Sequence, residues 1–238
     1  MNFDKTAIVT GGATGIGKAC VKILSKSGYK VHLLYLNSYE EANSLESENI
    51  FIHRVDVSDE TQVKSFFNLI TSFDILVNNA GGNISFKPTS NYEIDDWNKT
   101  FELNTLSVFL MCKYGIPLIL DGGKIVNVSS ISAKSGGAPG GMAYAASKAA
   151  VDCMTKSLAK ELSNRNICVN SVSPGIVWTK QHEKFSSKKY YDSLVEKVPL
   201  GRDGKTTDIA NLVKFLVSSN SDDITGQIIE INGGMLMK

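Results

Sequence analysis

Tyr144 and Lys148 are the residues of this sequence whose types and spacing most directly suggest chemistry. They stand four residues apart in the stretch AYAASKAAVDCMTKSLAKEL, which covers residues 143–162. Residues i and i+4 share one face of a helix, so the phenol and the ammonium are expected to point the same way. A phenol has an ordinary pKa of about 10, and a nearby cation lowers it by favouring the phenolate. The pair is therefore expected to exchange a proton near neutral pH. The alternative is a core tyrosine beside a lysine that snorkels to the surface.

Two further polar residues could take part in the same chemistry. Ser130 ends the apolar run GKIVNVSS, a predicted buried strand, and open α/β sheets bind ligands at the carboxyl ends of their strands. Ser129 is the competing choice, because strand alternation directs only one of the two side chains to the site. Asn104 lies inside a long predicted helix. Asparagine is a poor residue there, so it indicates a backbone kink or a bound water, unless it is simply tolerated.

A glycine-rich loop, TGGATGIG, follows the first apolar run and opens the first predicted helix. Gly11, Gly15 and Gly17 have the spacing GxxxGxG, a variant of the GxGxxG dinucleotide fingerprint. Glycines permit a tight turn, and they let a pyrophosphate approach a helix N-terminus whose N–H groups and dipole favour anions. A turn without a ligand is the alternative, but the position at the head of a βα array favours a nucleotide site.

The end of the second predicted strand bears on which nucleotide would bind. An acid at this point commonly holds the ribose 2′-hydroxyl of NAD. Here the chain reads Tyr35-Leu36-Asn37-Ser38, with no carboxylate to repel a 2′-phosphate and no Arg or Lys to bind one. Asn37 and Ser38 could hydrogen-bond either group, or could cap the next helix. The expected cofactor is NADP or NAD, and the missing acid favours NADP.

Six motifs, in this order and approximate spacing, resemble the compact form of the short-chain dehydrogenase/reductase family, including its 3-oxoacyl-(acyl-carrier-protein) reductases. They are TGGATGIG, NNAG at 78–81, Asn104 in FELNT, Ser130 in VNVSS, Tyr144-x-x-x-Lys148 and SPGIV. The resemblance implies an NAD(P)-dependent oxidoreductase that transfers a hydride between nicotinamide and a carbonyl or secondary alcohol. Tyr144 would be its general acid and base, and Lys148 would also hold the ribose hydroxyls. Ser130 would donate to the substrate oxygen, and Asn104 would hold a water of the proton relay.

The resemblance also implies the contacts with the cofactor. Asp56 and Val57 would bind adenine, although Asp56 is also a plausible helix cap. Ala80 and Gly81 are small and would leave room for the adenosine ribose beside the chain. The whole set expected at the cofactor, besides Tyr144 and Lys148, is Gly11, Thr14, Gly15, Ile16, Gly17, Tyr35, Asn37, Ser38, Asp56, Val57, Asn79, Ala80, Gly81, Pro174, Gly175, Ile176 and Thr179.

Apolar runs alternate with helical patterns along the whole chain and would position these residues. The strands expected are 6–10, 30–36, 50–57, 73–81, 123–130, 167–175 and 226–233, and the helices are 15–27, 39–46, 60–72, 95–118, 144–162 and 207–218. Strands that are apolar throughout are buried on both faces, which indicates a parallel sheet. The prediction is an α/β fold: a single doubly wound, Rossmann-type domain over 1–238, with about seven parallel strands and helices on both faces.

The one long irregular region, 175–205, is expected to contain a substrate lid at about 178–205. Its aromatic side chains would line the site or pack the lid on the body: Trp178, His182, Phe185, Tyr190 and Tyr191. Arg165 matches one docking position for an acidic acyl carrier protein, whereas Asp121 at the other position would repel it. The substrate is expected to be a small carbonyl or alcohol, such as a ketone, a sugar or a steroid-like alcohol, or an acyl thioester.

Composition and charge limit the remaining function classes. The chain has 238 residues, 42% of them hydrophobic, and a net charge of +1, which gives no reason to expect nucleic acid or a membrane as partner. Four cysteines without a CxxC pair and three scattered histidines indicate reduced thiols and no metal site. Without a signal peptide or a spanning run, a cytoplasmic protein is expected. The resemblance implies a homotetramer. A catalytically silent dinucleotide-binding or scaffold protein is the alternative function.

Overall fold

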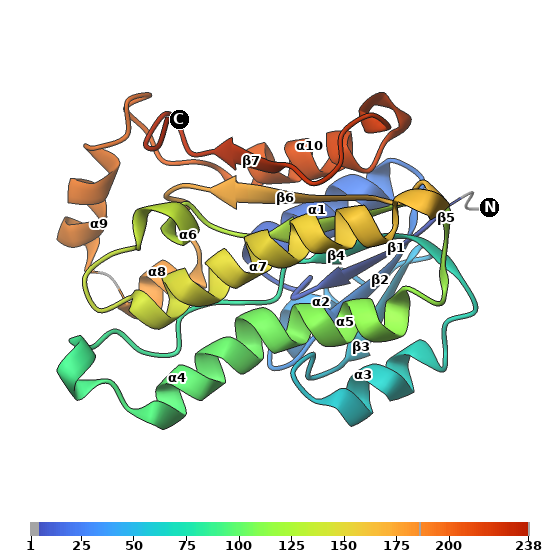
Figure 1. Cartoon of the computed structure of the whole chain (residues 1–238), viewed down its shortest axis with the longest axis horizontal. Helices are drawn as coiled ribbons and strands as arrows, with labels where there is room; N and C mark the ends of the chain where they lie inside the picture. Colours follow the sequence, from blue (N-terminus) through green and yellow to red (C-terminus); the bar gives the residue numbers. More distant parts are fainter. Residues whose placement is uncertain (1–4, 186, 238) are drawn as a thin grey trace.

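A sheet of seven parallel strands forms the centre of the structure (Figure 1). The computed structural model describes residues 5–185 and 187–237, without the side chains of Gln181, His182 and Lys184. The strand order is β3-β2-β1-β4-β5-β6-β7, as a doubly wound fold requires. The strands are β1 (Thr6–Thr10), β2 (Lys30–Tyr35), β3 (Ile50–Arg54), β4 (Phe73–Asn78), β5 (Ile119–Val128), β6 (Cys168–Pro174) and β7 (Ile228–Ile231).

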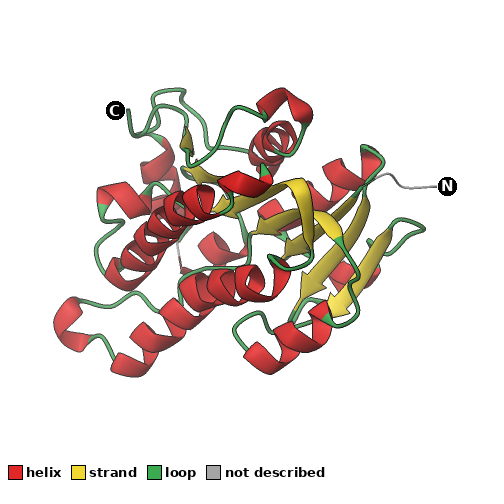
Figure 2. Ribbon diagram, turned by 45° about the vertical axis from the view of Figure 1, so that its right-hand side comes forward, coloured by secondary structure: helices red, strands yellow, loops and turns green. Residues whose placement is uncertain are grey.

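Helices cover both faces of the sheet, as Figure 2 shows. In β1, Ala7 and Val9 belong to the hydrophobic core on one face and Ile8 to the core on the other, and all three are fully buried. Alternation along a strand sends successive side chains to opposite faces, so a strand covered on both sides must be apolar throughout. This explains the continuous apolar runs of the sequence and confirms the predicted α/β class.

The helices follow the predicted order with different ends. The first core holds α1 (Gly15–Lys26) and α10 (Thr206–Leu216), and the second holds α3 (Glu60–Phe67), α5 (Ser107–Gly115) and α7 (Met142–Glu161). The short α2 (Tyr39–Asn43) and α6 (Ser132–Ser135) complete the loops after β2 and β5. The predicted ranges 39–46 and 60–72 were too long. None of the helices in the described part of the chain is long and apolar enough to span a membrane.

The long helix predicted over 95–118 is broken into α4 (Ile94–Phe101), a π-helical turn (Glu102–Leu106) and α5. Asn104 is fully buried inside that π turn. A π turn inserts an extra residue into the helical ladder and frees backbone groups for other partners. The backbone irregularity expected at this asparagine is therefore present.

The region 175–205, predicted as irregular, contains two helices, α8 (Lys180–Phe185) and α9 (Lys188–Val195). Ser187 caps α9 by accepting a hydrogen bond from the backbone N–H of Tyr190. Both helices lie at the left of Figure 1, where the arrowheads of β6 and β7 end. They therefore stand over the carboxyl edge of the sheet. Strand order reverses between β1 and β4, and ligand crevices of doubly wound sheets form beyond this edge at such a point.

Candidate active site

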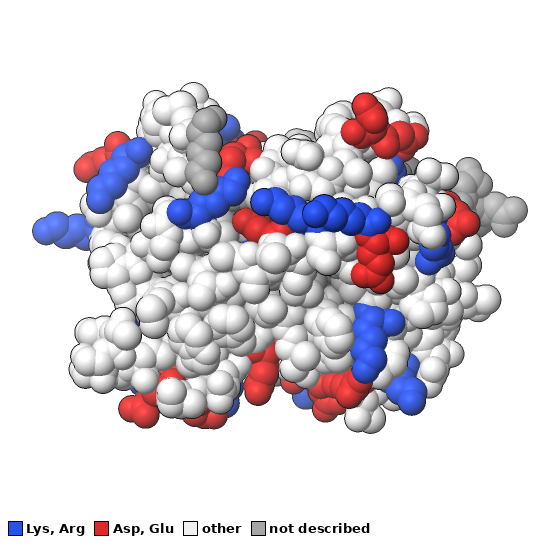
Figure 3. Space-filling model, viewed as in Figure 1, with Lys and Arg blue, Asp and Glu red and all other residues white. Residues whose placement is uncertain are grey.

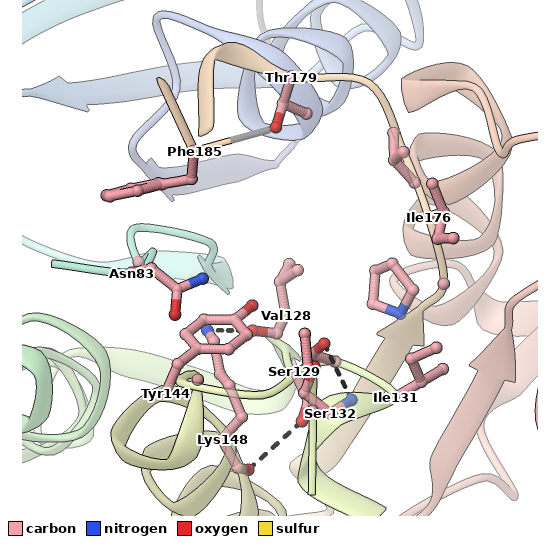
Figure 4. A pocket seen from close by; sticks show the side chains of 18 of the residues that line it. Asn83, Val128, Ser129, Ile131, Ser132, Tyr144, Lys148, Ile176, Thr179 and Phe185 are labelled. Carbon is pink, nitrogen blue, oxygen red and sulfur yellow. Dashed lines mark hydrogen bonds between the residues drawn. The ribbon is translucent and has the colours of Figure 1, made fainter. Parts of the chain in front are cut away.

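A cavity of about 860 Å³ opens at the carboxyl edge of the sheet, beneath α8 and α9 (Figure 4). Its walls come from the glycine loop, the ends of β4, β5 and β6, the start of α7, and the segment that contains α8 and α9. The expected site residues that line it are Gly11, Thr14, Gly15, Ile16, Asn79, Ala80, Gly81, Ser130, Tyr144, Lys148, Pro174, Gly175, Ile176 and Thr179. Most of the predicted site thus meets in one place.

Tyr144 and Lys148 face one another within this cavity. The Lys148 ammonium lies 5.9 Å from the centre of the Tyr144 ring. Its Nζ donates a hydrogen bond of 2.8 Å to the Val128 carbonyl, and Figure 4 shows this bond behind the tyrosine ring. Lys148 is only 3% exposed. The predicted pairing on one helix face is therefore confirmed, and strand β5 fixes the ammonium in place.

Burial controls the protonation of both groups. It raises the pKa of the Tyr144 phenol, and a hydrogen bond with Ser130 offsets this in part. Burial also lowers the pKa of Lys148 to about 8, against the attraction of the Asp152 carboxylate. The prediction that Tyr144 would have a lowered pKa is wrong in direction for this structure, because burial of the phenol raises its pKa and the Ser130 hydrogen bond opposes this only in part.

The two serines at the end of β5 point to different partners. Ser130 hydrogen-bonds the Tyr144 phenol, and its Oγ accepts a 3.1 Å bond from the Ser132 N–H. Ser129 donates from Oγ to the Lys148 carbonyl at 3.4 Å, so it faces the helix. Strand alternation thus places Ser130 beside the phenol, as the family spacing implied.

Asn104 is connected to the site through the glycines after β4. Its Nδ2 donates to the Gly82 carbonyl and its Oδ1 accepts from the Gly82 N–H, each at 2.9 Å. It does not line the cavity. A methyl group on Gly81 would lie 2.7 Å from the Asn104 Oδ1 and 2.9 Å from the Lys148 Nζ. Position 81 therefore requires a glycine, because the Asn104 and Lys148 side chains both pack against its backbone.

The glycine loop is built as an open cradle. Gly11 and Gly15 have positive φ, at 62° and 54°, which favours glycine. A Cβ on Gly17 would lie 2.2 Å from the Gly11 carbonyl, so Gly17 serves close packing rather than lining. Asn79 braces the loop by donating from Nδ2 to the carbonyls of Thr10 and Gly11, at 2.9 and 3.2 Å. A bare loop that leads into the N-terminus of α1 fits a pyrophosphate.

The residues expected at the adenosine end lie outside the cavity: Tyr35, Asn37, Ser38, Asp56 and Val57. Tyr35 and Val57 are buried in the core. The Asp56 carboxylate accepts bonds from the N–H and the hydroxyl of Ser58, at 2.9 and 2.6 Å, while Asp59 caps α3. Ser38 is the N-cap residue of α2, but its side chain makes no capping hydrogen bond. Asn37 and Ser38 therefore remain open to a ligand.

Sequence reasoning missed two charged residues near the site. Arg54, the last residue of β3, pairs in register with Tyr35, and its Nε donates to the Leu36 carbonyl at 3.2 Å. This places a guanidinium beside the loop that was expected to lack a cation. Asp152, four residues after Lys148, is 9% exposed and attracts the ammonium. The spacing of i and i+4 along α7 was a signal that could have identified Asp152.

The lid helices contribute both apolar and charged groups. The Phe86 and Phe185 rings stand 5.4 Å apart and line the cavity together with Tyr190. Trp178 and Tyr191 pack edge to face at 4.4 Å, so these two aromatics pack within the lid. The side chain of His182 lies outside the described residues. Lys180 forms an ion pair with Glu41 of α2, which ties the start of α8 to the far side of the glycine loop.

Among the described residues, no group of three or more His, Cys, Asp or Glu side chains could hold a metal ion. The cavity lining brings a phenol, an ammonium and hydroxyl groups together beside the glycine loop.

Comparisons with known proteins agree with this geometry. A sequence profile described as "Enoyl-(Acyl carrier protein) reductase" matches residues 11–236. The 3-oxoacyl-[acyl-carrier-protein] reductase FabG of Staphylococcus aureus (strain Mu50) is 35% identical over 252 residues, with both chains fully covered. The FabG of Rickettsia conorii is 35% identical and covers 98% of this chain and 97% of its own. Each relative is an oxidoreductase by name.

Solved structures give the same result. A blue fluorescent protein from a metagenomic library, in complex with NADPH, has a TM-score of 0.92 at 31% identity and 98% coverage of both chains. A short chain dehydrogenase from Burkholderia cenocepacia, in complex with NADP, has a TM-score of 0.91 at 31% identity and 97% coverage of both. The order of motifs, the cavity with its facing phenol and ammonium, and these full-length likenesses lead to one conclusion: the chain belongs to the short-chain dehydrogenase/reductase family and is a nicotinamide-dependent oxidoreductase.

Proposed function

We propose that this protein uses NADP(H) to interconvert a carbonyl group and a secondary alcohol, with Tyr144 as its general acid and base. One observation supports this proposal most strongly. The Tyr144 phenol faces the buried Lys148 ammonium in a cavity that the glycine loop also lines. A bound nicotinamide supplies or accepts the hydride. The chain has to position the substrate oxygen and move one proton.

The protein groups divide this work between them. In the reducing direction Tyr144 gives its proton to the substrate oxygen, and its raised pKa keeps the phenol protonated beforehand. Ser130, hydrogen-bonded to the same phenol, is placed to donate to that oxygen. Lys148 stabilises the phenolate that remains and holds the ribose hydroxyls. Asn104 keeps the backbone at Gly82 in place and is proposed to hold a water behind the lysine.

The remaining cofactor contacts are proposed from the same arrangement. The glycine loop would hold the pyrophosphate, while Pro174, Gly175, Ile176 and Thr179 would contact the nicotinamide side, since all four line the cavity. Asp56 and Val57 stay predictions for adenine, with the Asp56 carboxylate partly engaged by Ser58.

Arg54 supports NADP(H) rather than NAD(H). Its Nε is bound to the Leu36 carbonyl, and the side chain is exposed beside Asn37 and Ser38. A guanidinium is suited to a phosphate because its planar N–H groups can donate in pairs. The relatives crystallised with NADPH and NADP point the same way.

The Arg165 contacts speak against a carrier-bound acyl thioester as substrate. Arg165 donates to the carboxylate of Asp121 at 2.7 Å and to the carbonyls of Ile116 and Ile119. Asp121 thus partners Arg165 instead of standing apart from it. A guanidinium that already makes an ion pair and two further hydrogen bonds is less available to an acidic carrier protein. A small carbonyl compound is therefore the better-supported substrate, and a thioester is the second candidate because of the FabG relatives.

A homotetramer is proposed from the surface of α4, α5 and α7. Figure 3 shows a band without charged residues across the middle of this face. Phe109 is 50% exposed and lines a shallow hollow there with Phe101, Leu106 and Met154. Met111 and Val151, two other apolar residues of α5 and α7, are buried in the core. A cytoplasmic location, and a lid role for 178–205 within a single domain, stay predictions.

The test is to assay the purified protein with NADPH and a panel of ketones, in wild-type and Tyr144→Phe forms. Loss of the proton donor should lower kcat by about 10²- to 10⁴-fold and leave NADPH binding intact. Turnover that survives the substitution would remove Tyr144 from the mechanism. NADPH binding without turnover of any carbonyl would support the catalytically silent alternative, which the intact Tyr144 and Lys148 disfavour.

A further inference from the structure

The charges that line the cavity all have one sign. Its described lining contains three lysines, Lys148, Lys180 and Lys197, and no aspartate or glutamate. Two of the lysines already have partners, since Lys148 donates to the Val128 carbonyl and Lys180 pairs with Glu41. Lys197 forms no ion pair with any residue that the structure describes, and its side chain is exposed.

Lys197 lines the cavity beside the end of α9. It stands two residues after Val195, the last residue of α9, and its N–H donates to the Leu194 carbonyl, so the helical turn continues through it. Tyr190, Leu194 and Lys197 have the spacing i, i+4 and i+7, which places them along one face, and all three line the cavity. The Lys197 ammonium thus follows an apolar wall formed by Tyr190 and Leu194.

The groups around this wall define an apolar chamber. Met235 lines the cavity and packs against the core cluster of the lid, which also includes Leu194. Phe86 and Phe185 stand in ring contact, and Figure 4 shows Phe185 above Asn83 and Tyr144. A molecule that contacted both Tyr144 and Lys197 would meet some of these apolar side chains and the Lys197 ammonium.

The lid as a whole is basic. Residues 178–205 contain seven lysines and arginines and four aspartates and glutamates, whereas the entire chain has a net charge of only +1. Three of the four acids have partners within the same segment: Glu183 accepts from Trp178, Asp192 pairs with Lys188, and Asp203 accepts from Tyr191. A basic lid over a cavity without acids raises the local concentration of anions.

We propose that the carbonyl substrate carries an anionic group, a carboxylate or a phosphate, which Lys197 binds at the lid end of the cavity. The inference rests on the proposed function, because it concerns the substrate of that same site. The apolar side chains that line the cavity with Lys197 further favour carbon between the carbonyl and the anion.

Matched pairs of carbonyl compounds test the proposal. Levulinate and acetoacetate are compared with their methyl esters, and dihydroxyacetone phosphate with dihydroxyacetone, each with NADPH. The anionic member of at least one pair should have the higher kcat/KM, and the pair shows whether a carboxylate or a phosphate is preferred. Lys197→Gln should raise KM for the anion by about fivefold and leave the neutral partner unchanged. Rising salt should have the same selective effect on the wild type.

Lys189→Gln is the matched control, because Lys189 is exposed on the same helix and does not line the cavity. This substitution should leave the KM of both compounds of each pair unchanged. Calorimetric binding of the same compounds to Tyr144→Phe with NADP gives a readout that needs no turnover. Equal affinity for anion and ester, or an equal effect of the two lysine substitutions, would overturn the proposal. A protein that binds neither NADPH nor NADP would instead refute the proposed function.

Discussion

The Lys148 ammonium donates a 2.8 Å hydrogen bond to the Val128 carbonyl, at the last residue of β5. The bond crosses from helix α7 to the central sheet and holds a cation that is almost completely removed from water. Removing an ammonium from water is unfavourable, and here it lowers the pKa of Lys148 to about 8. Burying this ammonium lowers the folding stability but keeps a positive charge beside Tyr144. Active sites commonly reduce stability in this way.

Lys148→Met should therefore separate stability from activity. The folded pKa of about 8 lies below the ordinary value of 10.5, so the unfolded chain binds this proton more tightly. The loss of folding stability that comes from burying this charge is fully present below pH 8. It decreases as the pH rises from 8 to 10.5. At pH 7 the free energy of unfolding of the variant, measured with urea, should be higher by on the order of 1–3 kcal/mol, and its turnover should be lost. A less stable variant would mean that the bond to Val128 outweighs the desolvation of the charge.

Gly81→Ala should disturb the site without unfolding the protein. Its methyl group would lie 2.7 Å from the Asn104 Oδ1 and 2.9 Å from the Lys148 Nζ, so one of these side chains must move. We expect a loss of about 1–3 kcal/mol in stability from this crowding. kcat should fall by at least about tenfold, because a displaced ammonium no longer faces the phenol. Unchanged kcat and KM, measured with the best ketone of the panel, would contradict the arrangement.

Arg54→Gln should weaken NADPH binding and leave NADH binding unchanged. A charge-assisted contact with the 2′-phosphate is worth about tenfold in Kd at an exposed site. Competition by 2′,5′-ADP against 5′-AMP isolates that phosphate from the nicotinamide. Lys64→Gln, an exposed charge on α3, is the control and should affect neither nucleotide. A parallel loss of NADH and NADPH affinity would show that Arg54 acts only on the fold.

His32→Phe should make the protein less sensitive to acid. His32 Nδ1 lies 2.9 Å from His53 Nε2, and burial, with help from His53 and Lys30, lowers the pKa of His32 to about 4. The unfolded chain takes up this proton near pH 6.5, so stability is lost as the pH falls from 6.5 towards 4. At pH 5 the loss from His32 is about 2 kcal/mol. Urea midpoints at pH 7 and pH 5 should converge in the variant.

Features that depend on local sequence were predictable. The glycine loop, the alternation of strands and helices, and the facing pair Tyr144 and Lys148 follow from residue spacing along one element. Asn104 signalled an irregular helix, because its amide competes with the backbone for hydrogen bonds. Helices α8 and α9 were missed because they span only six and eight residues, and a periodic pattern needs a window of about 11 residues or more.

Features that depend on pairing between strands were not predictable in the same way. Arg54 reaches the loop after β2 only because β3 pairs with β2 in a register that sets it opposite Tyr35. Nothing in the sequence near Leu36 shows this. The pKa of Tyr144 was misjudged for a related reason. The spacing to Lys148 gave the attraction of the cation, whereas the burial of the phenol depends on the whole cavity.

The ion pair between Lys180 and Glu41 joins helices that are 139 residues apart in the chain. Together with Thr179, which lies over Gly15, it forms a clasp across the cradle. We predict that a dinucleotide leaves the cradle more slowly while this ion pair is formed. Both charges are partly exposed, so added salt would loosen it, and the residence time of the cofactor would shorten with ionic strength.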